Sequence, residues 1–375
     1  MMPLGKKSIR QTLCVLLLLA GVSCERVSDQ KESLTSHPTQ PAVWRIAWRA
    51  TCSDAQPNAP TPLPPNNWVV SDTAGGVTAL SHQGQRLWQT ICSNQIFEAA
   101  AWASQTQVVV ASLKGQVFAF YPETGALCWT TQLDARFQHQ PLSGYLPDQT
   151  AVLWLVSQSD GSLFCLRQKD GKLLWQSDPV NRCDGKPTLW SGGLAYGNCD
   201  GAVHVFDSAT GHRVGSVVIG SEDQMAGSLL ALAPDALATG TRQGHLVVVN
   251  PLTLLCEARV KVSESEAFLS PLLAFDGLIA MGTQEGMVSF WRFEKSGLQP
   301  AGHVTVDRPV DALAFNDNQL FVLAGGTLSI FGAVDTLQQR LVLGDEVYGL
   351  TLINAPLVAC VADGAILCLK EARDE

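Results

Sequence analysis

The segment GQVFAF (Gly115–Phe120) decides the fold, because one glycine followed by alternating apolar residues recurs eight times along the chain. The eight segments are GGVTAL from Gly75, GQVFAF from Gly115, GSLFCL from Gly161, GAVHVF from Gly201, GHLVVV from Gly244, GMVSFW from Gly286, GTLSIF from Gly326 and GAILCL from Gly364. Such alternation is typical of half-buried strands, and glycine supplies the positive φ that a tight hairpin needs. One blade per repeat predicts an all-β, eight-bladed β-propeller.

The strand that follows the next turn carries a tryptophan in the early repeats. The segments LSHQGQRLW, FYPETGALCW and LRQKDGKLLW end at Trp88, Trp129 and Trp175. This pattern resembles the PQQ-type propeller repeat, and the resemblance covers nearly all of the repeat region. On the outermost strand, such a tryptophan would fill the gap between neighbouring blades. The later repeats have Gly215 and Ala258 at the equivalent places, so other side chains must fill those gaps.

The two ends of the chain are predicted to close the ring together. The eighth repeat stops after its third strand, whereas AVWRIAWRA (residues 42–50) reads as a tryptophan-bearing strand with no blade of its own. We therefore expect residues 43–50 to form the fourth strand of the last blade, with Trp44 at the place of the outer-strand tryptophan. Closure of this kind leaves only short, protected sheet edges. The propeller is predicted to cover residues 43–375.

The composition of the 375-residue chain fits a large β-fold. Hydrophobic residues make up 46% and charged residues 16%, with 32 glycines and 19 prolines. The chain is too apolar to be disordered and too rich in turn-forming residues to be helical. The net charge of −9 argues against a nucleic-acid partner, which would require basic patches.

The first residues, 1–23, are predicted to be a signal peptide. Lys6, Lys7 and Arg10 form a basic start, and the apolar run Cys14–Val22 (CVLLLLAGV) follows them. That run is too short to span a bilayer but has the length of a signal-peptide core. The chain is therefore expected to be exported.

The end of the apolar run, LLLLAGVSC, resembles the lipobox of bacterial lipoproteins. The resemblance implies that Cys24 is acylated and becomes the first mature residue, and that Glu25 directs the protein to the periplasmic face of the outer membrane. An ordinary secretory signal that is cleaved nearby is the alternative. Residues 24–42 lack apolar periodicity and are rich in Ser, Thr, Gln and Pro, so we expect a flexible tether.

The resemblance to PQQ-type repeats raises the hypothesis of a quinone enzyme. Quinoprotein dehydrogenases hold the quinone over a Ca²⁺ site, often beside a pair of adjacent cysteines. This sequence has no adjacent cysteines and lacks the long insertions that build that site. Hydrolase, zinc-protease and P-loop motifs are also lacking, and the seven histidines are scattered without ligand spacing. We therefore predict no catalytic residues, no metal and no cofactor.

Cysteine usage suggests one disulfide. Of eleven cysteines, two belong to the signal peptide and the predicted lipid site, which leaves an odd number in an oxidising compartment. Cys183 precedes the innermost strand of its blade and Cys199 follows the next strand. Antiparallel pairing would bring both to the same end, so we predict a Cys183–Cys199 bridge. A bridge between Cys52 and Cys92, in loops before two blades, is a second candidate.

A proline-rich stretch separates the predicted closing strand from the first blade. Residues 51–67 (TCSDAQPNAPTPLPPNN) contain five prolines. One interpretation is a spacer that has been lengthened by insertion. The other is a partner-binding arm, because stiff proline-rich segments lose little entropy on docking.

One face of the predicted ring carries an excess of acidic residues. Loops between blades share this face with the turns that join the second and third strands, and acids outnumber bases there beyond what turn chemistry requires. We interpret the excess as steering of a basic partner or a cationic ligand. The candidate residues are Glu222 and Asp223 in GSEDQMAG, and Glu264 and Glu266 in VSESEAF. The alternative is that these acids only cap turns and maintain solubility.

The repeat type, lipobox, blade number and mature length together resemble the BamB-type lipoproteins of the outer-membrane β-barrel assembly machinery. The resemblance implies a non-catalytic, lipid-anchored scaffold that binds other envelope proteins, the assembly complex being one candidate partner, and no nucleic acid. A ligand-binding or quinone-dependent periplasmic protein is the alternative. Fold-level analogy does not establish function, because propellers host many functions.

Overall fold

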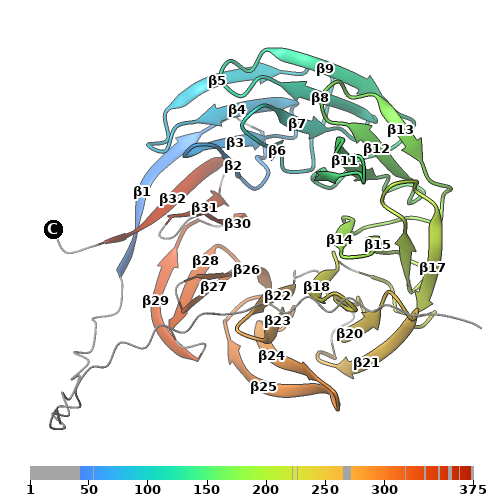
Figure 1. Cartoon of the computed structure of the whole chain (residues 1–375). Helices are drawn as coiled ribbons and strands as arrows, with labels where there is room; N and C mark the ends of the chain where they lie inside the picture. Colours follow the sequence, from blue (N-terminus) through green and yellow to red (C-terminus); the bar gives the residue numbers. More distant parts are fainter. Residues whose placement is uncertain are drawn as a thin grey trace, which may run out of the picture. The chain divides into compact units, whose positions relative to one another are not determined.

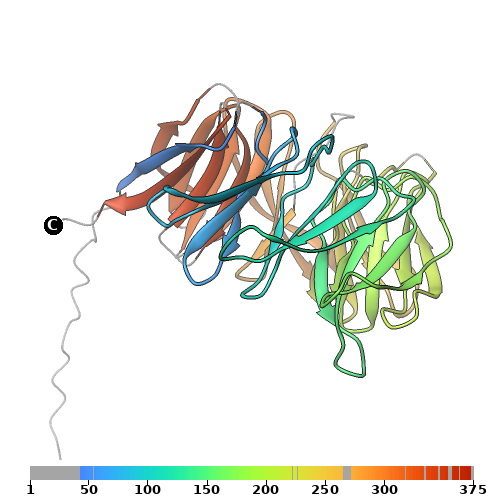
Figure 2. The same cartoon turned by 90° about the horizontal axis from the view of Figure 1, so that it is seen from above.

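The predicted all-β, eight-bladed propeller is confirmed. The computed structural model describes residues 43–53, 55–221, 223–225, 227–264, 272–316, 318–332, 335–344, 347–353, 357–362 and 364–372. Their strands form eight four-stranded antiparallel sheets that surround a ring as blades (Figure 1). Figure 2 gives the same ring from its edge. The predicted signal peptide, lipid site and tether lie outside the described residues. Within the described ranges, no helix is long and apolar enough to cross a membrane.

Blades 1 to 7 follow one another in sequence, and each begins with its innermost strand. Blade 1 contains β2 (Thr61–Leu63), β3 (Asn67–Ser71), β4 (Gly76–Leu80) and β5 (Arg86–Ile91), and blade 2 contains β6 (Trp102–Ala103), β7 (Val108–Ala111), β8 (Gln116–Phe120) and β9 (Leu127–Gln132). Blade 3 contains β10 (Leu142–Tyr145), β11 (Ala151–Val156), β12 (Leu163–Arg167) and β13 (Leu173–Gln176), and blade 4 contains β14 (Thr188–Trp190), β15 (Gly193–Gly197), β16 (Ala202–Phe206) and β17 (Arg213–Val218). Blade 5 contains β18 (Leu230–Ala233), β19 (Ala236–Gly240), β20 (His245–Asn250) and β21 (Leu255–Lys261), and blade 6 contains β22 (Leu272–Phe275), β23 (Leu278–Gly282), β24 (Met287–Glu294) and β25 (Gly297–Thr305). Blade 7 contains β26 (Val310–Asn316), β27 (Gln319–Ala324), β28 (Thr327–Gly332) and β29 (Thr336–Val342).

Blade 8 is closed by the N-terminal strand, as predicted. Its order is β30 (Val347–Ile353), β31 (Leu357–Ala362), β32 (Ala365–Ala372) and then β1 (Val43–Thr51) on the outside. The register of β1 against β32 extends over the full length of β1. Figure 1 shows the two strands side by side. Both ends of the propeller are therefore held in one sheet, which gives blade 8 four strands like the others.

The repeat glycines occupy the turns between the second and third strands of the blades. All eight have φ between +70° and +83°, a conformation that favours glycine. Space is also limiting, because a Cβ added at Gly115 would overlap the carbonyl oxygen of Leu133 in the following linker. The same two residues are bonded, since the Leu133 N–H donates to the Gly115 carbonyl at 2.9 Å. The glycine therefore fits both the turn and the linker that packs on it.

Four outer-strand tryptophans clamp consecutive junctions between blades. Trp48, Trp88, Trp129 and Trp175 pack on Gly84, Gly125, Gly171 and Gly211 respectively, in the last turn of the next blade, where a Cβ would overlap the indole ring. The indole N–H groups of Trp48, Trp88 and Trp129 also donate to the carbonyls of His82, Pro122 and Gln168, at 2.9, 2.6 and 3.0 Å. The four junctions between blades 8 and 1, 1 and 2, 2 and 3, and 3 and 4 therefore share this tryptophan-on-glycine arrangement.

The predicted place of Trp44 is wrong, because Trp48 takes the clamping position in blade 8. Trp48 pairs with Cys368, just as Trp88 pairs with Ala79 in blade 1. Trp44 instead turns toward blade 7, where its ring meets Phe321 edge-on at a centroid distance of 5.1 Å. The N-terminal strand therefore contacts both neighbours of its blade, one through each tryptophan.

The other four junctions lack the tryptophan and are packed differently. The equivalent outer-strand positions are Gly215, Ala258, Gly302 and Gln339, which are identified by their β-sheet partners. Between blades 4 and 5, Leu254 reaches back over Gly215 from the turn. Between blades 7 and 8, the side-chain amide of Gln339 accepts the backbone N–H of Trp44 at 2.7 Å and donates to the backbone carbonyl of Trp44 at 2.8 Å. At these two junctions, the expectation that later repeats remake this packing with other side chains is confirmed.

The proline-rich stretch is part of blade 1. The innermost strand β2 lies within it, and Leu63 is 2% exposed. The segment before β2 pairs along the blade, since the Asn58 N–H donates to the Ser71 carbonyl at 2.8 Å and Pro57 bridges Asp72. The described part of this stretch is therefore folded against the blade, which argues against a free arm.

Candidate protein-docking site

The predicted steering acids differ in their exposure, and only two of the four are among the described residues. Glu222 and Glu266 lie outside the described residues. Glu264 has an exposed carboxylate, with its Oε2 4.0 Å from the Lys261 Nζ. Asp223 is fully buried, so its prediction as an exposed partner-binding residue is wrong.

Asp223 is buried because it fastens the linker between blades 4 and 5. Its carboxylate pairs with the Arg259 guanidinium, contacts His245 Nδ1 at 2.9 Å and accepts the Thr241 hydroxyl at 3.0 Å. Buried charges are stable only when they are paired and hydrogen-bonded in this way. Asp223 therefore has a structural role.

A charged cluster on the same face collects groups from three blades. Asp184, in the linker between β13 and β14, accepts hydrogen bonds from Arg182 Nε at 3.0 Å and from Arg242 Nη2 at 3.4 Å. Gln158 Nε2 at 3.3 Å and the Cys199 thiol at 3.4 Å complete its contacts. Gln158 comes from a turn of blade 3, Cys199 from blade 4 and Arg242 from blade 5. Together with the exposed Lys186, the residues Arg182, Asp184 and Arg242 form what we call the Asp184 cluster.

The outward charge of the Asp184 cluster is positive. The Asp184 side chain is only 13% exposed, whereas those of Arg182 and Arg242 are 56% and 40% exposed. Burial alone would raise the pKa of Asp184, but hydrogen bonds from Arg182, Cys199 and Gln158 hold that pKa below its usual value. The carboxylate therefore stays ionised and fixes two guanidinium groups at the surface. This part of the face suits an acidic group on a partner, whereas the sequence analysis predicted a basic partner or a cationic ligand.

The predicted Cys183–Cys199 disulfide is not formed, although both cysteines are among the described residues. The buried Cys183 thiol donates to the carbonyls of Gly185 at 3.1 Å and Gly197 at 3.3 Å. The Cys199 thiol points to Asp184 instead. Burial raises the pKa of Cys183 to about 12, so its thiol is protonated and unreactive at neutral pH. The second candidate pair, Cys52 and Cys92, also consists of free thiols.

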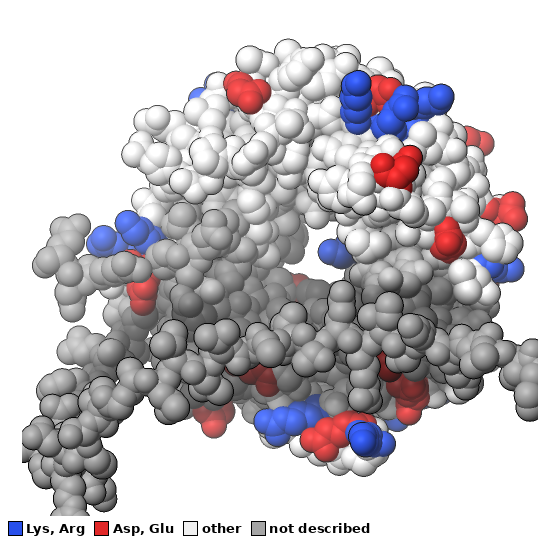
Figure 3. Space-filling model, in the orientation of Figure 1, with Lys and Arg blue, Asp and Glu red and all other residues white. Residues whose placement is uncertain are grey.

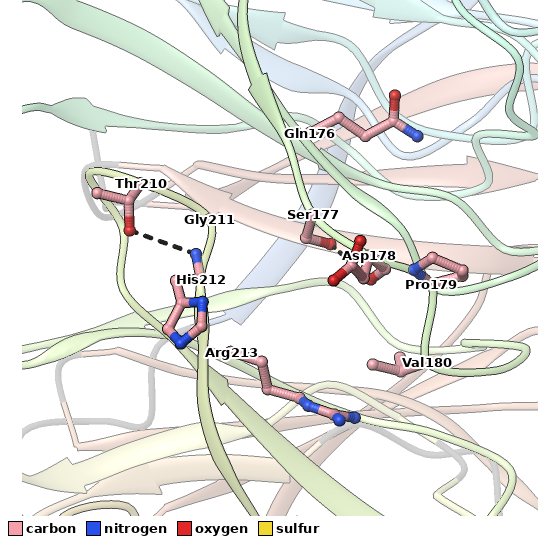
Figure 4. Close-up of a pocket in the computed structure, with 9 residues that line it drawn as sticks. All are labelled: Gln176, Ser177, Asp178, Pro179, Val180, Thr210, Gly211, His212 and Arg213. Carbon is pink, nitrogen blue, oxygen red and sulfur yellow. Dashed lines mark hydrogen bonds between the residues drawn. The ribbon is translucent and has the colours of Figure 1, made fainter.

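The first half of the same linker borders a hollow on the rim of the ring. The hollow has a volume of about 320 Å³ and lies between Gln176–Val180, at the end of β13 and the start of the linker, and Thr210–Arg213, where the last turn of blade 4 leads into β17. Figure 4 shows His212 and Arg213 on the turn side, opposite Asp178, Pro179 and Val180. The linker between blades 3 and 4 therefore has polar surface along both halves.

In the part of the surface that Figure 3 leaves uncovered by grey atoms, charges of both signs are interspersed. Within the described residues, no group of three or more His, Cys, Asp or Glu side chains is arranged to hold a metal ion. What the site presents is a set of positioned hydrogen-bond donors and cations. Such a surface is suited to recognition of another molecule.

The four-stranded blades and the tryptophan-on-glycine junctions define the class of the protein as a β-propeller of PQQ-type repeats. The family model described as outer membrane protein assembly factor BamB matches residues 73–228 and 143–295. These overlapping matches cover more than half of the chain, and the chain belongs to this family.

Proteins similar to the chain include one curated relative and several solved structures. Outer membrane protein assembly factor BamB of Burkholderia pseudomallei (strain K96243) is 26% identical over 157 residues, which is 39% of this chain and 41% of that protein. BamB from Moraxella catarrhalis superimposes with a TM-score of 0.70 at 19% identity, over 89% of this chain and 99% of that one. The computationally designed Ika8 protein gives 0.69 at 19% identity, over 85% and 98% of the two chains. Saccharomyces cerevisiae Sqt1 gives 0.66 at 15% identity, over 90% and 98%. At these identities the structural likeness concerns the fold alone.

Proposed function

We propose that the protein is a non-catalytic scaffold of the bacterial envelope that acts in the assembly of outer-membrane β-barrel proteins. Membership of the BamB family supports this role. The lipobox-like segment before Cys24 supports a lipid anchor on the periplasmic face of the outer membrane. In this proposal the propeller binds a protein partner, and the Asp184 cluster is its docking site.

The observation that carries the docking proposal is the pair of exposed guanidinium groups held by one nearly buried carboxylate. Arginine is enriched among residues that dominate binding energy, because its planar fork matches a carboxylate. Asp184 fixes both forks before the partner arrives, which reduces the entropy lost on binding. The proposed partner therefore presents an acidic side chain to this place on the ring.

We expect the double variant Arg182→Gln/Arg242→Gln to bind the periplasmic part of the barrel-forming assembly subunit about 10-fold or more weakly, as expected for loss of interfacial arginines. Lys186→Gln, which leaves both arginine–Asp184 pairs intact, should weaken binding by a few fold and mainly through the association rate. Arg167→Gln removes an exposed ion pair with Asp170 elsewhere on the propeller and serves as the matched control. Binding kinetics at two ionic strengths measure these effects. Unchanged affinity in the double variant, with an unchanged melting temperature, would exclude the Asp184 cluster as the docking site.

The exposed Glu264, with Glu222 and Glu266, remains a proposed steering group for a basic part of the partner. Glu264 supports this proposal because its carboxylate is 94% exposed and only weakly paired with Lys261. Asp223 is no longer included, because it is buried. Steering of this kind would act on the association rate and would diminish with salt.

The anchor has its own test. The variant Cys24→Ser should lose labelling with a palmitate analogue and should move from the membrane fraction to the soluble fraction, because serine cannot form the thioether on which acylation depends. Cys256→Ser, which changes an exposed free cysteine of the propeller, is the control and should remain labelled and membrane-bound. Labelling and membrane retention of Cys24→Ser would show that Cys24 is not the anchor.

A further inference from the structure

A recess next to the Asp184 cluster lies where the linkers that lead into blades 1, 2 and 3 meet. Its volume is about 380 Å³. It is lined by three short segments, one per linker: Gln56–Ala59, Glu98–Ala100 and Gln138–Gln140. Each segment lies just before the innermost strand of its blade, so the recess is on the inner side of the ring.

Side chains tie the three linkers to one another around the recess. Asn58 Nδ2 donates to the Phe97 carbonyl at 2.8 Å, which links the first segment to the second. Gln140 Nε2 reaches from the third segment to the Ala101 carbonyl at 2.5 Å. That same carbonyl accepts the Thr61 hydroxyl of β2 at 2.6 Å. The walls are thus fixed by hydrogen bonds between blades.

The three blades whose linkers form the recess belong to the clamped half of the ring. Trp88 holds blade 1 against blade 2, and Trp129 holds blade 2 against blade 3. Both tryptophans are at most 9% exposed. A recess with fixed walls loses little conformational entropy when a ligand enters, so binding does not need to order the protein first.

The chemistry of the walls suits an extended polypeptide. Four amide side chains line the recess, those of Gln56, Asn58, Gln138 and Gln140. The amide nitrogens of Asn58, Gln138 and Gln140 already donate within the protein, so these three side chains offer chiefly their carbonyl oxygens to the N–H groups of a peptide main chain. Pro57 and the alanines leave room for an extended backbone between these amides. None of the lining residues is Phe, Tyr or Trp, so a sugar ring or a nucleobase has no large aromatic face to stack on.

The recess has one anionic group. Glu98 is exposed and accepts a hydrogen bond from Gln138 Nε2 at 2.5 Å, which holds its carboxylate at the edge of the recess. The other titratable lining residue, His139, is uncharged near neutral pH, because burial lowers its pKa to about 4, while Asp184 opposes and Lys186 assists this shift. The net charge of the lining is therefore negative, opposite in sign to the Asp184 cluster.

We propose that this recess binds an extended polypeptide segment that carries a lysine or arginine, with the amides holding its main chain and Glu98 pairing with the cationic side chain. The site is independent of the docking role proposed for the Asp184 cluster. One face of the propeller would then hold two places of opposite charge, which allows a scaffold to engage two different segments at once.

The test uses two fluorescently labelled, N-acetylated peptides of glycine, serine and alanine, one with a central lysine and one with a central glutamate. Fluorescence anisotropy with the full chain in detergent should show binding of the lysine peptide and at least 5-fold weaker binding of the glutamate peptide. The variant Glu98→Gln should weaken binding of the lysine peptide about 5- to 10-fold, the effect of one charge-assisted hydrogen bond. The variant Ala100→Phe should abolish binding by filling the recess.

Two control variants show whether these effects are specific to the recess. Asp134→Asn removes an exposed acid from a linker without touching the recess, and Arg167→Gln removes an exposed charge elsewhere on the propeller. Both should bind the lysine peptide like the unaltered protein. The proposal would be overturned if the lysine peptide failed to bind, if both peptides bound equally, or if Glu98→Gln and Ala100→Phe kept full affinity. None of these results depends on the barrel-assembly partner.

Discussion

Removal of residues 43–50 is expected to abolish cooperative folding of the propeller. The deletion removes nearly all of β1, exposes the whole edge of β32, and takes away both tryptophans that hold blade 8 to its neighbours. Loss of one buried tryptophan side chain typically costs about 3–5 kcal/mol. The loss of two approaches the entire stability of an ordinary domain, about 5–15 kcal/mol. The truncated chain should aggregate or give no single melting transition, because a long apolar edge promotes association.

Thermal unfolding and soluble yield measure this effect. A deletion of residues 26–40, which precedes the described part of the chain, is the matched control and should leave the melting temperature unchanged. The single variants Trp44→Ala and Trp48→Ala should each lower the melting temperature, because Trp44 is 3% exposed and Trp48 packs on Gly84. Equal melting temperatures for the two deletions would contradict closure of the ring by β1.

The repeat predicted the fold because the turn and the third strand of each blade are specified by a few consecutive residues. A turn that requires positive φ can be read from one glycine, and the alternation after it identifies the third strand. All eight glycines have this role, and the closing strand falls where the incomplete eighth repeat required it. The two tryptophans of β1 were harder to assign. The outer strands of the tryptophan-bearing blades share a register irregularity next to the clamping position, and in β1 it lies between Ile46 and Trp48. The clamping position is therefore Trp48, four residues beyond Trp44.

The candidate site was much less predictable, because it depends on burial and on contacts between distant segments. Asp223 and Glu264 look alike in the sequence, yet one is buried against Arg259 and the other is exposed. Arg242 belongs to another blade and bonds to Asp184, and no local sequence pattern predicts that pairing. The disulfide prediction placed Cys183 and Cys199 at the same end of the blade, but it could not foresee that each thiol finds other hydrogen-bond partners.

The junction between blades 4 and 5 shows how the fold survives loss of the tryptophan. In blades 2 to 4, the residue that receives the indole ring is a glycine with positive φ, and in blade 5 the same position is Leu254, with a φ of +58°. In each of these blades, the outer-strand position that carries the tryptophan lies four residues after the turn residue that receives the indole ring of the preceding blade. This outer-strand position is Trp129 in blade 2 and Gly215 in blade 4. The contact is thus reversed between blades 4 and 5, because the large side chain comes from the turn and the glycine from the strand.

This reversal predicts strong coupling between Gly215 and Leu254. The variant Gly215→Trp should lose about 1–3 kcal/mol of stability, because Leu254 already occupies the space. The variant Leu254→Gly should also be destabilised, since loss of the packed side chain leaves a cavity that relief of its left-handed backbone only partly offsets. The double variant Gly215→Trp/Leu254→Gly restores the arrangement of Trp88 on Gly125, so it should be more stable than either single variant. Denaturant unfolding of the four proteins gives the coupling energy, expected at about 2 kcal/mol or more for residues in direct contact. Additive effects would show that the two positions do not compensate each other, and that Leu254 is not the substitute for the missing tryptophan.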